Sequence, residues 1–367
     1  MIKVWDYLRE YEKEKNEIHE AIEQVLTSGW LILGQQVKDF ESSFAAYCGV
    51  SYGVGVNSGT DALFLALKAI GVGSGDEVIT VSNTAVPTVS AIVSTGAVPR
   101  FVDIDPRTYL MDTDLLEGAI NKNTKCILPV HLYGQCVNMG KLTALAEKHG
   151  IPVLEDCAQS HGAEYQGKRA GAMSALAAFS FYPTKILGGY GDGGMVVTDD
   201  ESIYKKLLRL RFYGMEKTYY ALEHGYNSRL DELHAAILLK KLDHLNEYIN
   251  RRRALAAIYD EMLADTPLTL PFRDPDGRHA FYLYVCRHAR RDAIIAKLAE
   301  HNISVNVSYP WPIHTMEGYR SLGYAAGDFP HTEAAAKEIF SLPMYPGLDT
   351  AAQLQVIERL KEILKQL

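Results

Sequence analysis

A lysine follows directly after an apolar run in AAFSFYPTKILGGYGDGG, which places Lys185 at the exit of an expected strand rather than on a solvated face. A lysine amine forms a Schiff base with a carbonyl compound when it can lose its proton near neutral pH. Burial beside apolar or cationic groups lowers the pKa of an amine and permits this loss. Because most isolated lysines are simply solvated, Lys185 is a candidate for this chemistry only in combination with other residues.

A carboxylate ends another apolar run, since Asp156 closes IPVLED in the stretch VLEDCAQSHGA. Ligands of open α/β sheets bind beyond the carboxyl ends of the strands, so we expect this side chain to point into the crevice. There it can keep the pyridine nitrogen of pyridoxal phosphate (PLP) protonated, which lets the ring accept electrons. The alternative is that Asp156 only caps the following turn.

The stretch VGVNSGTDALFLALKAIG is typical of a strand, a polar loop and a helix. Gly59 and Thr60 then lie at the N-terminus of the helix, where free backbone N–H groups and the helix dipole bind phosphate. The alternative use of Ser58 and Thr60 is ordinary N-capping. With Lys185 and Asp156, this loop supplies the third element that a PLP site requires.

Short β-rich runs alternate with helical patterns up to about residue 245 and predict an α/β fold with a mostly parallel sheet and helices on both faces. The expected strands are YGVGV, EVITV, VPRFVDI, KCILPV, IPVLED, SALAAFSFY and GGMVVT, and residues 14–27 form an expected docking helix. Further on, HAFYLYVC, DAIIAKLAEHN and an amphipathic helix after Asp349 predict a smaller α+β unit. We therefore expect a large domain at residues 1–245 and a small C-terminal domain at residues 246–367.

Composition excludes several classes of partner. The 367 residues carry a formal net charge of −8, which offers no basic surface to nucleic acid or to an anionic membrane. The five cysteines are odd in number and form no CxxC pair, so we expect reduced thiols. The start of the sequence has no signal-peptide pattern, and no apolar stretch approaches a membrane span. We therefore expect a cytoplasmic protein with no membrane contact.

The histidines show no HExxH-like spacing, and no metal site is predicted.

Two glycine patterns approach the dinucleotide fingerprint G-x-G-x-x-G. Gly189, Gly191 and Gly194 fit its spacing, but a strand (MVVT) follows them where the fingerprint requires a helix. Gly53 and Gly55 lie inside an expected strand, and the third small residue is missing there. A NAD-dependent sugar oxidoreductase therefore stays only as a distant alternative.

Taken together, these stretches resemble the DegT/StrS family of PLP-dependent nucleotide-sugar aminotransferases. The resemblance runs through almost the whole chain, in the order SGWLILGQQVKDFE, NSGTDAL, GDEVIT, PVHLYGQ, EDCAQSHGA, FSFYPTK, GDGG, NSRLDELHAA and SLPMYP. It implies the PLP-dependent transferase fold of the aspartate aminotransferase type (fold type I). In that fold a large domain with a mostly parallel seven-stranded sheet precedes a smaller α+β C-terminal domain.

The resemblance also implies roles for single residues. Lys185 would bind PLP covalently, Asp156 would pair with the pyridinium nitrogen, and Gln159 would lie by the ring and its 3-oxygen. The residues implied at the cofactor phosphate are Gly59, Thr60, Ser180 and, from a neighbouring subunit of a homodimer, Asn227. The residues implied at the substrate are His131, His161, Tyr182, Arg229 and His314, with Arg229 on a carboxylate.

The implied reaction moves an amino group from glutamate to a nucleotide-linked keto-sugar in amino-sugar biosynthesis for a surface polysaccharide or a glycoside. The GDGG and FSFYPTK contexts favour a dTDP-3-keto-6-deoxyhexose, and a 4-keto nucleotide sugar is the alternative. One position departs from the family. Where its members commonly stack an aromatic residue on the PLP ring, this chain has Ala85 in NTAVPT, so Val86, Pro87 or another residue must cover that face.

Overall fold

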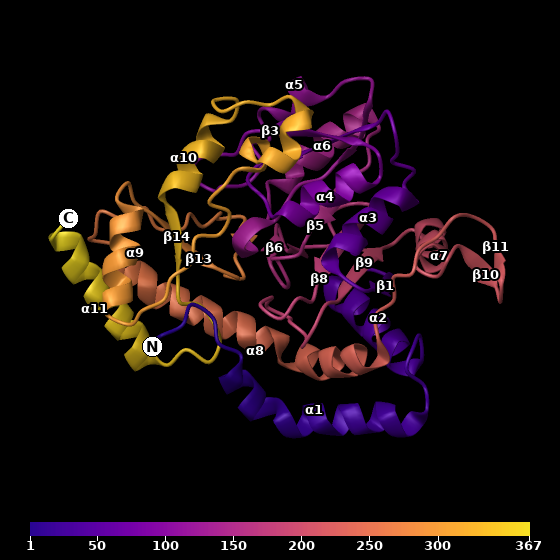
Figure 1. The fold of residues 1–367 in the computed structure, drawn as a ribbon, viewed down its shortest axis with the longest axis horizontal. Coiled ribbons are helices and arrows are strands. Elements are labelled where there is room, and N and C mark those ends of the chain that lie inside the picture. Colours follow the sequence, from indigo (N-terminus) through magenta and orange to yellow (C-terminus); the bar gives the residue numbers. More distant parts are fainter.

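In the computed structural model, which describes residues 1–367, seven short apolar strands form the central sheet (Figure 1). In spatial order they are β1 (Tyr52–Val56), β9 (Gly194–Thr198), β8 (Leu176–Ser180), β5 (Leu154–Asp156), β4 (Thr124–Ile127), β2 (Glu77–Val81) and β3 (Val98–Val102). The parallel bridges Ile127–Val153 and Val130–Asp156 join the β5 side of the sheet to the β4 side. Every neighbouring pair is parallel except the two that include β9. The predicted mostly parallel, seven-stranded sheet is confirmed.

The strands are nearly continuous apolar runs because helices cover both of their faces. Every residue of β8 and β9 is buried. Helix α3 packs on β8 and β9, whereas α2 packs on β1, and the two helices lie on either side of these strands in Figure 1. Helix α8 packs against α2 and carries α1 on its outer side. The helices are α1 (Leu8–Ser28), α2 (Gln35–Cys48), α3 (Gly59–Ala69), α4 (Val86–Ser94), α5 (Leu116–Ala119), α6 (Met139–His149), α7 (Glu201–Leu210), α8 (Glu232–Leu263), α9 (Arg291–Glu300), α10 (Pro330–Glu338) and α11 (Thr350–Lys365).

Small elements complete the chain. Short strands form three further small sheets. In these, β6 (Glu164–Tyr165) pairs with β7 (Lys168–Arg169) and β12 (Gly277–Arg278), β10 (Met215–Lys217) pairs with β11 (Tyr220–Ala221), and β13 (Tyr284–Arg287) pairs with β14 (Ile339–Leu342). The 3₁₀ turns are η1 (Leu132–Gly134), η2 (Ile313–Thr315) and η3 (Glu317–Leu322). The β10–β11 hairpin projects from the body of the molecule beyond α7 (Figure 1).

A second apolar cluster lies under α9, α11 and the C-terminal half of α8, and it includes Tyr259, Tyr284 and Phe340. The expected last helix is present as α11, and Asp349 caps it by accepting a hydrogen bond from the Ala352 N–H at 2.7 Å. Helix α8 runs without a break through residue 245, so both expected domains share it. The boundary at residue 245 stays a prediction. No helix has both the length and the apolar character needed to cross a membrane.

Candidate active site

A cavity of about 310 Å³ opens where the carboxyl ends of β1, β2, β5 and β8 meet. Parallel strands bring these ends to one edge of the sheet, which is where open α/β sheets bind ligands. The cavity is lined by Ser58, Gly59, Thr60, Leu63, Thr84, Ala85, Pro87, Thr88, Val130, Asp156, Ala158, Gln159, Ser180, Tyr182, Lys185 and Asp192. The fold therefore brings together seven of the predicted residues, which are Gly59, Thr60, Asp156, Gln159, Ser180, Tyr182 and Lys185.

Lys185 lies in the turn that follows β8. Its backbone N–H donates to the Tyr182 carbonyl at 2.9 Å and closes this turn. The Lys185 ammonium lies 4.9 Å from the centre of the Tyr282 ring, and a 3.1 Å hydrogen bond joins the Tyr282 hydroxyl to Thr184. A lysine ammonium over an aromatic face is attracted by the ring quadrupole. Tyr282, which is itself hydrogen-bonded to Thr184, thus packs against the Lys185 amine at the cavity wall.

Asp156 ends β5 and is almost fully buried, with 4% of its surface exposed. Burial raises the pKa of this carboxyl, whereas hydrogen bonds from Thr88 and from the Ala158 N–H, together with the Lys185 ammonium, oppose that rise. The Thr88 hydroxyl donates to Asp156 Oδ2 at 2.8 Å, and the Ala158 N–H donates to Oδ1 at 3.1 Å. The site therefore holds an acid whose charge has little solvent and few fixed partners, so a cationic ligand group beside it would be strongly favoured.

Thr88 was not singled out from the sequence, although it follows β2 and so belongs to the same edge of the sheet as Asp156. A 2.8 Å hydrogen bond links its hydroxyl to that of Thr84. Because Thr88 gives its own proton to Asp156, Thr84 must donate to Thr88. The two threonines form a buried relay that ends on the Asp156 carboxylate. The sequence could have indicated Thr88 only by its position after a strand, because residues that follow strand ends line the crevice of an open α/β sheet.

Replacing Thr88 with valine removes one of the two donors to Asp156 while keeping the side-chain shape. A hydrogen bond to a charged group contributes about 1.5–3 kcal/mol, so we expect Thr88→Val to lower the catalytic rate by roughly 10- to 100-fold. The pKa of Asp156 should rise further, which moves the acidic limb of the pH–rate profile to higher pH. Thr88→Ser is the matched control and should keep the wild-type profile. An unshifted profile in Thr88→Val would contradict the relay.

The N-terminus of α3 forms one wall of the cavity. The Ser58 side chain caps the helix by accepting from the Asp61 N–H at 3.1 Å, which leaves the N–H groups of Gly59 and Thr60 without an intrahelical partner. A Cβ atom at Gly59 would lie 2.5 Å from the Ser180 Cβ, so only glycine permits this close approach. Two donors and the Ser180 hydroxyl therefore face the same space, an arrangement suited to an anion.

Gln159 is fixed at both ends of its amide. Its Oε1 accepts from the Tyr133 N–H at 2.8 Å, and its Nε2 donates to the Tyr309 hydroxyl at 2.5 Å. Tyr133 and Tyr309 adopt φ values of 61° and 66°, a left-handed conformation that is uncommon for aromatic residues. Such backbone strain persists where the surrounding structure enforces it, often at functional sites. The Gln159 side chain is thus held rigidly at the cavity wall.

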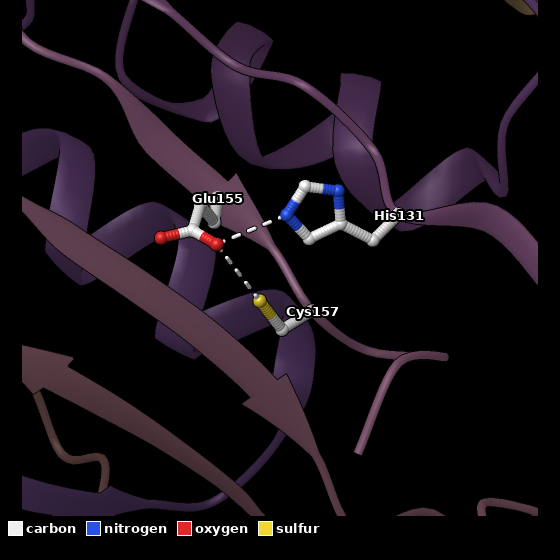
Figure 2. Close-up of side chains that lie close together, drawn as sticks. All are labelled: His131, Glu155 and Cys157. Atoms are coloured by element: carbon white, nitrogen blue, oxygen red, sulfur yellow. Dashed lines mark hydrogen bonds and ion pairs between the residues drawn. The ribbon is translucent and has the colours of Figure 1, made fainter. Parts of the chain in front are cut away.

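His131 does not line the cavity but fixes the strand that presents Asp156. Figure 2 shows its fully buried ring directed at Glu155, with a 3.0 Å contact from Nε2 to Oε2, and the Cys157 thiol directed at the same oxygen at 4.0 Å. His131 Nδ1 accepts from the Val137 N–H at 3.1 Å, so a neutral ring carries its proton on Nε2 and donates it to Glu155. The Glu155 carboxylate also accepts from the N–H groups of Gly171 and Met173. The geometry gives His131 a positioning contact with Glu155, and its substrate contact stays a prediction.

Two other predicted histidines also lie off the cavity wall. His161 is fully buried among Phe44, Phe179 and Phe181, and burial lowers its pKa to about 3, with a further lowering by the Lys185 ammonium. It is therefore neutral at physiological pH. His314 has a buried ring held between Ser82 Oγ at 2.7 Å and Glu333 Oε1 at 3.1 Å. The substrate roles implied for both remain predictions.

Asn227 and Arg229 also lie outside this cavity, in the segment that leads from the β10–β11 hairpin to α8. Asn227 is exposed, and its backbone forms a single bridge to Phe212. The Arg229 guanidinium lies 5.4 and 5.6 Å from the ring centres of Phe212 and Tyr213. Neither side chain therefore lines the cavity of its own chain.

The wall at Ala85 carries no aromatic side chain. Ala85 and Pro87 line the cavity, whereas Val86 does not and is 42% exposed. Tyr182 is the one aromatic residue of the lining. Of the two replacements considered from the sequence, only Pro87 reaches the cavity. With Ala85 and Val130 it supplies an apolar surface there.

Comparison with known proteins gives consistent matches along the chain. The family model described as the DegT/DnrJ/EryC1/StrS aminotransferase family matches residues 12–361. The dTDP-3-amino-3,4,6-trideoxy-alpha-D-glucose transaminase of Micromonospora megalomicea subsp. nigra is 54% identical over 98% of both chains. A crystal structure of S. venezuelae DesV superposes with a TM-score of 0.97 at 42% identity, covering 99% of this chain and 98% of that one. NtdA from Bacillus subtilis, solved with bound cofactor PMP, has a TM-score of 0.92 at 31% identity, covering 100% of this chain and 86% of that one.

Proposed function

Because this chain belongs to the DegT/DnrJ/EryC1/StrS aminotransferase family, we propose that it transfers the amino group of glutamate to a dTDP-linked 3-keto-6-deoxyhexose. The observation that carries this proposal is the shared cavity of Lys185, Asp156 and the α3 N-terminus. The 54% identity to a transaminase named for a dTDP-3-amino sugar favours attack at carbon 3 over carbon 4. The expected product serves amino-sugar biosynthesis.

The family is PLP-dependent, and the residues of this cavity fit that cofactor. Lys185 supplies an amine for the aldehyde, Asp156 supplies a buried carboxylate for the pyridinium nitrogen, and the α3 N-terminus with Ser180 supplies donors for the phosphate. Bound PLP would act as an electron sink when a bond to the reacting carbon breaks. The apolar surface of Ala85, Pro87 and Val130 is the wall we propose beside its ring, in place of a stacked aromatic residue.

Each side chain then has a separate task. The Lys185 amine binds the cofactor and, once released, carries a proton to or from the substrate carbon. The Asp156 carboxylate would hold the pyridinium nitrogen, and the hydrogen bond from the Thr88 hydroxyl stabilises its charge. Gln159 is held rigid by Tyr133 and Tyr309 and would contact the ring face or its 3-oxygen. Thr88, Asp156 and Gln159 are buried, which keeps water from competing for their hydrogen bonds.

The decisive experiment supplies purified protein and glutamate with a panel of 3-keto and 4-keto nucleotide sugars and measures product masses. We expect an amino product from dTDP-3-keto-6-deoxyhexoses. Amination of 4-keto sugars alone would overturn the assignment of carbon 3 but keep the aminotransferase. Absence of an amino product from every sugar, in the presence of bound PLP, would overturn the proposed acceptor class.

A homodimer with shared sites is the second part of the proposal. The projecting β10–β11 hairpin exposes Tyr219 at 95% and Tyr220 at 63%, and Trp30 is 62% exposed. Large exposed aromatic residues are typical of protein interfaces. Asn227, beside this hairpin, would reach the phosphate in the cavity of the second copy, and Arg229 would meet a substrate carboxylate there. Dimers mixed from Lys185→Ala and Asn227→Ala chains should regain activity that neither variant has alone, and no regain would contradict shared sites.

We also infer that the protein works in the cytoplasm. All five cysteines are free and buried, which suits a reducing compartment. Localisation of a tagged chain by cell fractionation would test this.

A further inference from the structure

A second cavity, of about 170 Å³, shares Lys185 with the first. It is lined by Tyr7, Glu10, Pro183, Lys185, Gly188, Gly189, Tyr190 and Lys241. Its walls come from three parts of the chain, namely the start of α1, the segment around Lys185 and the N-terminal part of α8. Lys185 therefore borders both cavities.

The cavity contains an acceptor without a partner. Glu10 Oε1 is shielded from solvent and makes no hydrogen bond. A buried polar group left unpaired costs about 1–3 kcal/mol, so such groups usually have a reason to persist. Lys241 pairs with Glu14 at 3.2 Å, with side chains 6% and 2% exposed. Burial raises the pKa of Glu10, and the charges of Arg252 and Lys241 oppose that rise, but neither cation makes a hydrogen bond to Oε1. Glu10 Oε1 is thus an unpaired acceptor that can take a hydrogen bond from a ligand.

The remaining walls suit a ring that carries both apolar C–H faces and polar substituents. Tyr7 and Tyr190 pack edge to face with ring centres 5.9 Å apart and present aromatic surface. Gly188 and Gly189 add backbone without side chains to the lining. Apolar surface with a few placed polar groups is typical of small-molecule sites. A sugar ring offers both C–H faces for the tyrosines and hydroxyl donors for a carboxylate.

We propose that this second cavity binds the hydroxyl-bearing part of the acceptor sugar, with Glu10 accepting a hydrogen bond from one hydroxyl. This inference rests on the proposed function, because it takes the acceptor to be a nucleotide-linked sugar. The amino donor fits the cavity less well. Each carboxylate of glutamate would meet the negative charge of Glu10, while the only other cation of the lining, Lys241, is paired with Glu14.

The test separates the two halves of the reaction in Glu10→Ala. Loss of a hydrogen bond to a charged acceptor should lower kcat/KM for the keto-sugar half-reaction by roughly 10- to 100-fold. The glutamate half-reaction, followed by the absorbance of the cofactor, should stay within about twofold of wild type because glutamate does not use Glu10. Glu10→Gln keeps an acceptor oxygen and should recover most of the loss. Glu20→Ala removes an exposed acid from the same helix and serves as the control.

A binding measurement adds a readout that does not depend on turnover. By calorimetry, Glu10→Ala should weaken binding of the dTDP-3-amino sugar product by a similar factor and leave binding of dTDP itself unchanged. Equal losses in both half-reactions, equal losses for dTDP and the sugar nucleotide, or no loss at all would each overturn the proposal. A wild-type protein that aminates no keto-sugar would instead refute the acceptor class before any variant is compared.

Discussion

Lys185→Ala is expected to abolish amino transfer and to leave PLP bound without a covalent link. Acid–base catalysis by a positioned side chain contributes about 10²- to 10⁴-fold, and the variant loses the covalent attachment as well. The rate should therefore fall by about 10⁴-fold or more. Borohydride treatment followed by mass spectrometry should add the cofactor mass to wild type and not to the variant.

Lys185→Arg is the matched control for this experiment. It keeps a positive charge near Tyr282 and Asp156 but cannot form the covalent bond, so it should be as inactive as the alanine variant. The two variants together separate the chemistry of the amine from its charge. Covalent cofactor in either variant would show that another lysine carries it.

Asp156→Asn is expected to lower the catalytic rate by about 10²- to 10³-fold, the effect of losing one preorganised electrostatic group. The amide cannot keep the pyridine nitrogen protonated, and PLP should bind more weakly. Asparagine matches aspartate in shape, and its one oxygen can accept from Thr88 or from the Ala158 N–H, so the fold should be retained with one of these two hydrogen bonds lost. Single-turnover rates and equilibrium dialysis of PLP measure the two losses. Asp156→Glu, which keeps the charge, should lose less activity, and the opposite ranking would contradict the assigned role.

Asp156→Asn lowers activity, but it should make the stability of the apoprotein less sensitive to rising pH. Burial raises the folded-state pKa of Asp156 above the usual carboxyl value of about 4. A carboxyl with a raised folded pKa stabilises the fold fully below its unfolded pKa, and this contribution is lost as the pH rises through the folded pKa. Between pH 4 and neutrality, apo wild type should therefore lose more free energy of unfolding than apo Asp156→Asn. Parallel urea midpoints across that range would contradict the burial argument.

The sequence determined the architecture because local patterns carry it. Each of the seven expected apolar runs became a strand of the central sheet, since a strand buried on both faces must be apolar along its length. Lys185, Asp156 and the NSGT loop follow such strands, so the direction of the strands alone brought them to one edge. The predicted family and its dependence on PLP are confirmed for the same reason, because the motifs are contiguous in sequence.

Only the tertiary structure decided which polar side chains face the cavity. His314 contacts Ser82, 232 positions away in sequence, and His131 contacts Glu155 on a neighbouring strand, so neither partner could be predicted from local sequence. Two further residues were identified only from the tertiary structure. Thr88 donates a hydrogen bond to the buried Asp156 carboxylate, and Glu10 Oε1 is buried without a hydrogen-bond partner. Periodicity fixes which residues are buried, whereas hydrogen bonds between distant segments depend on how the elements pack, and those contacts set the chemistry of the site.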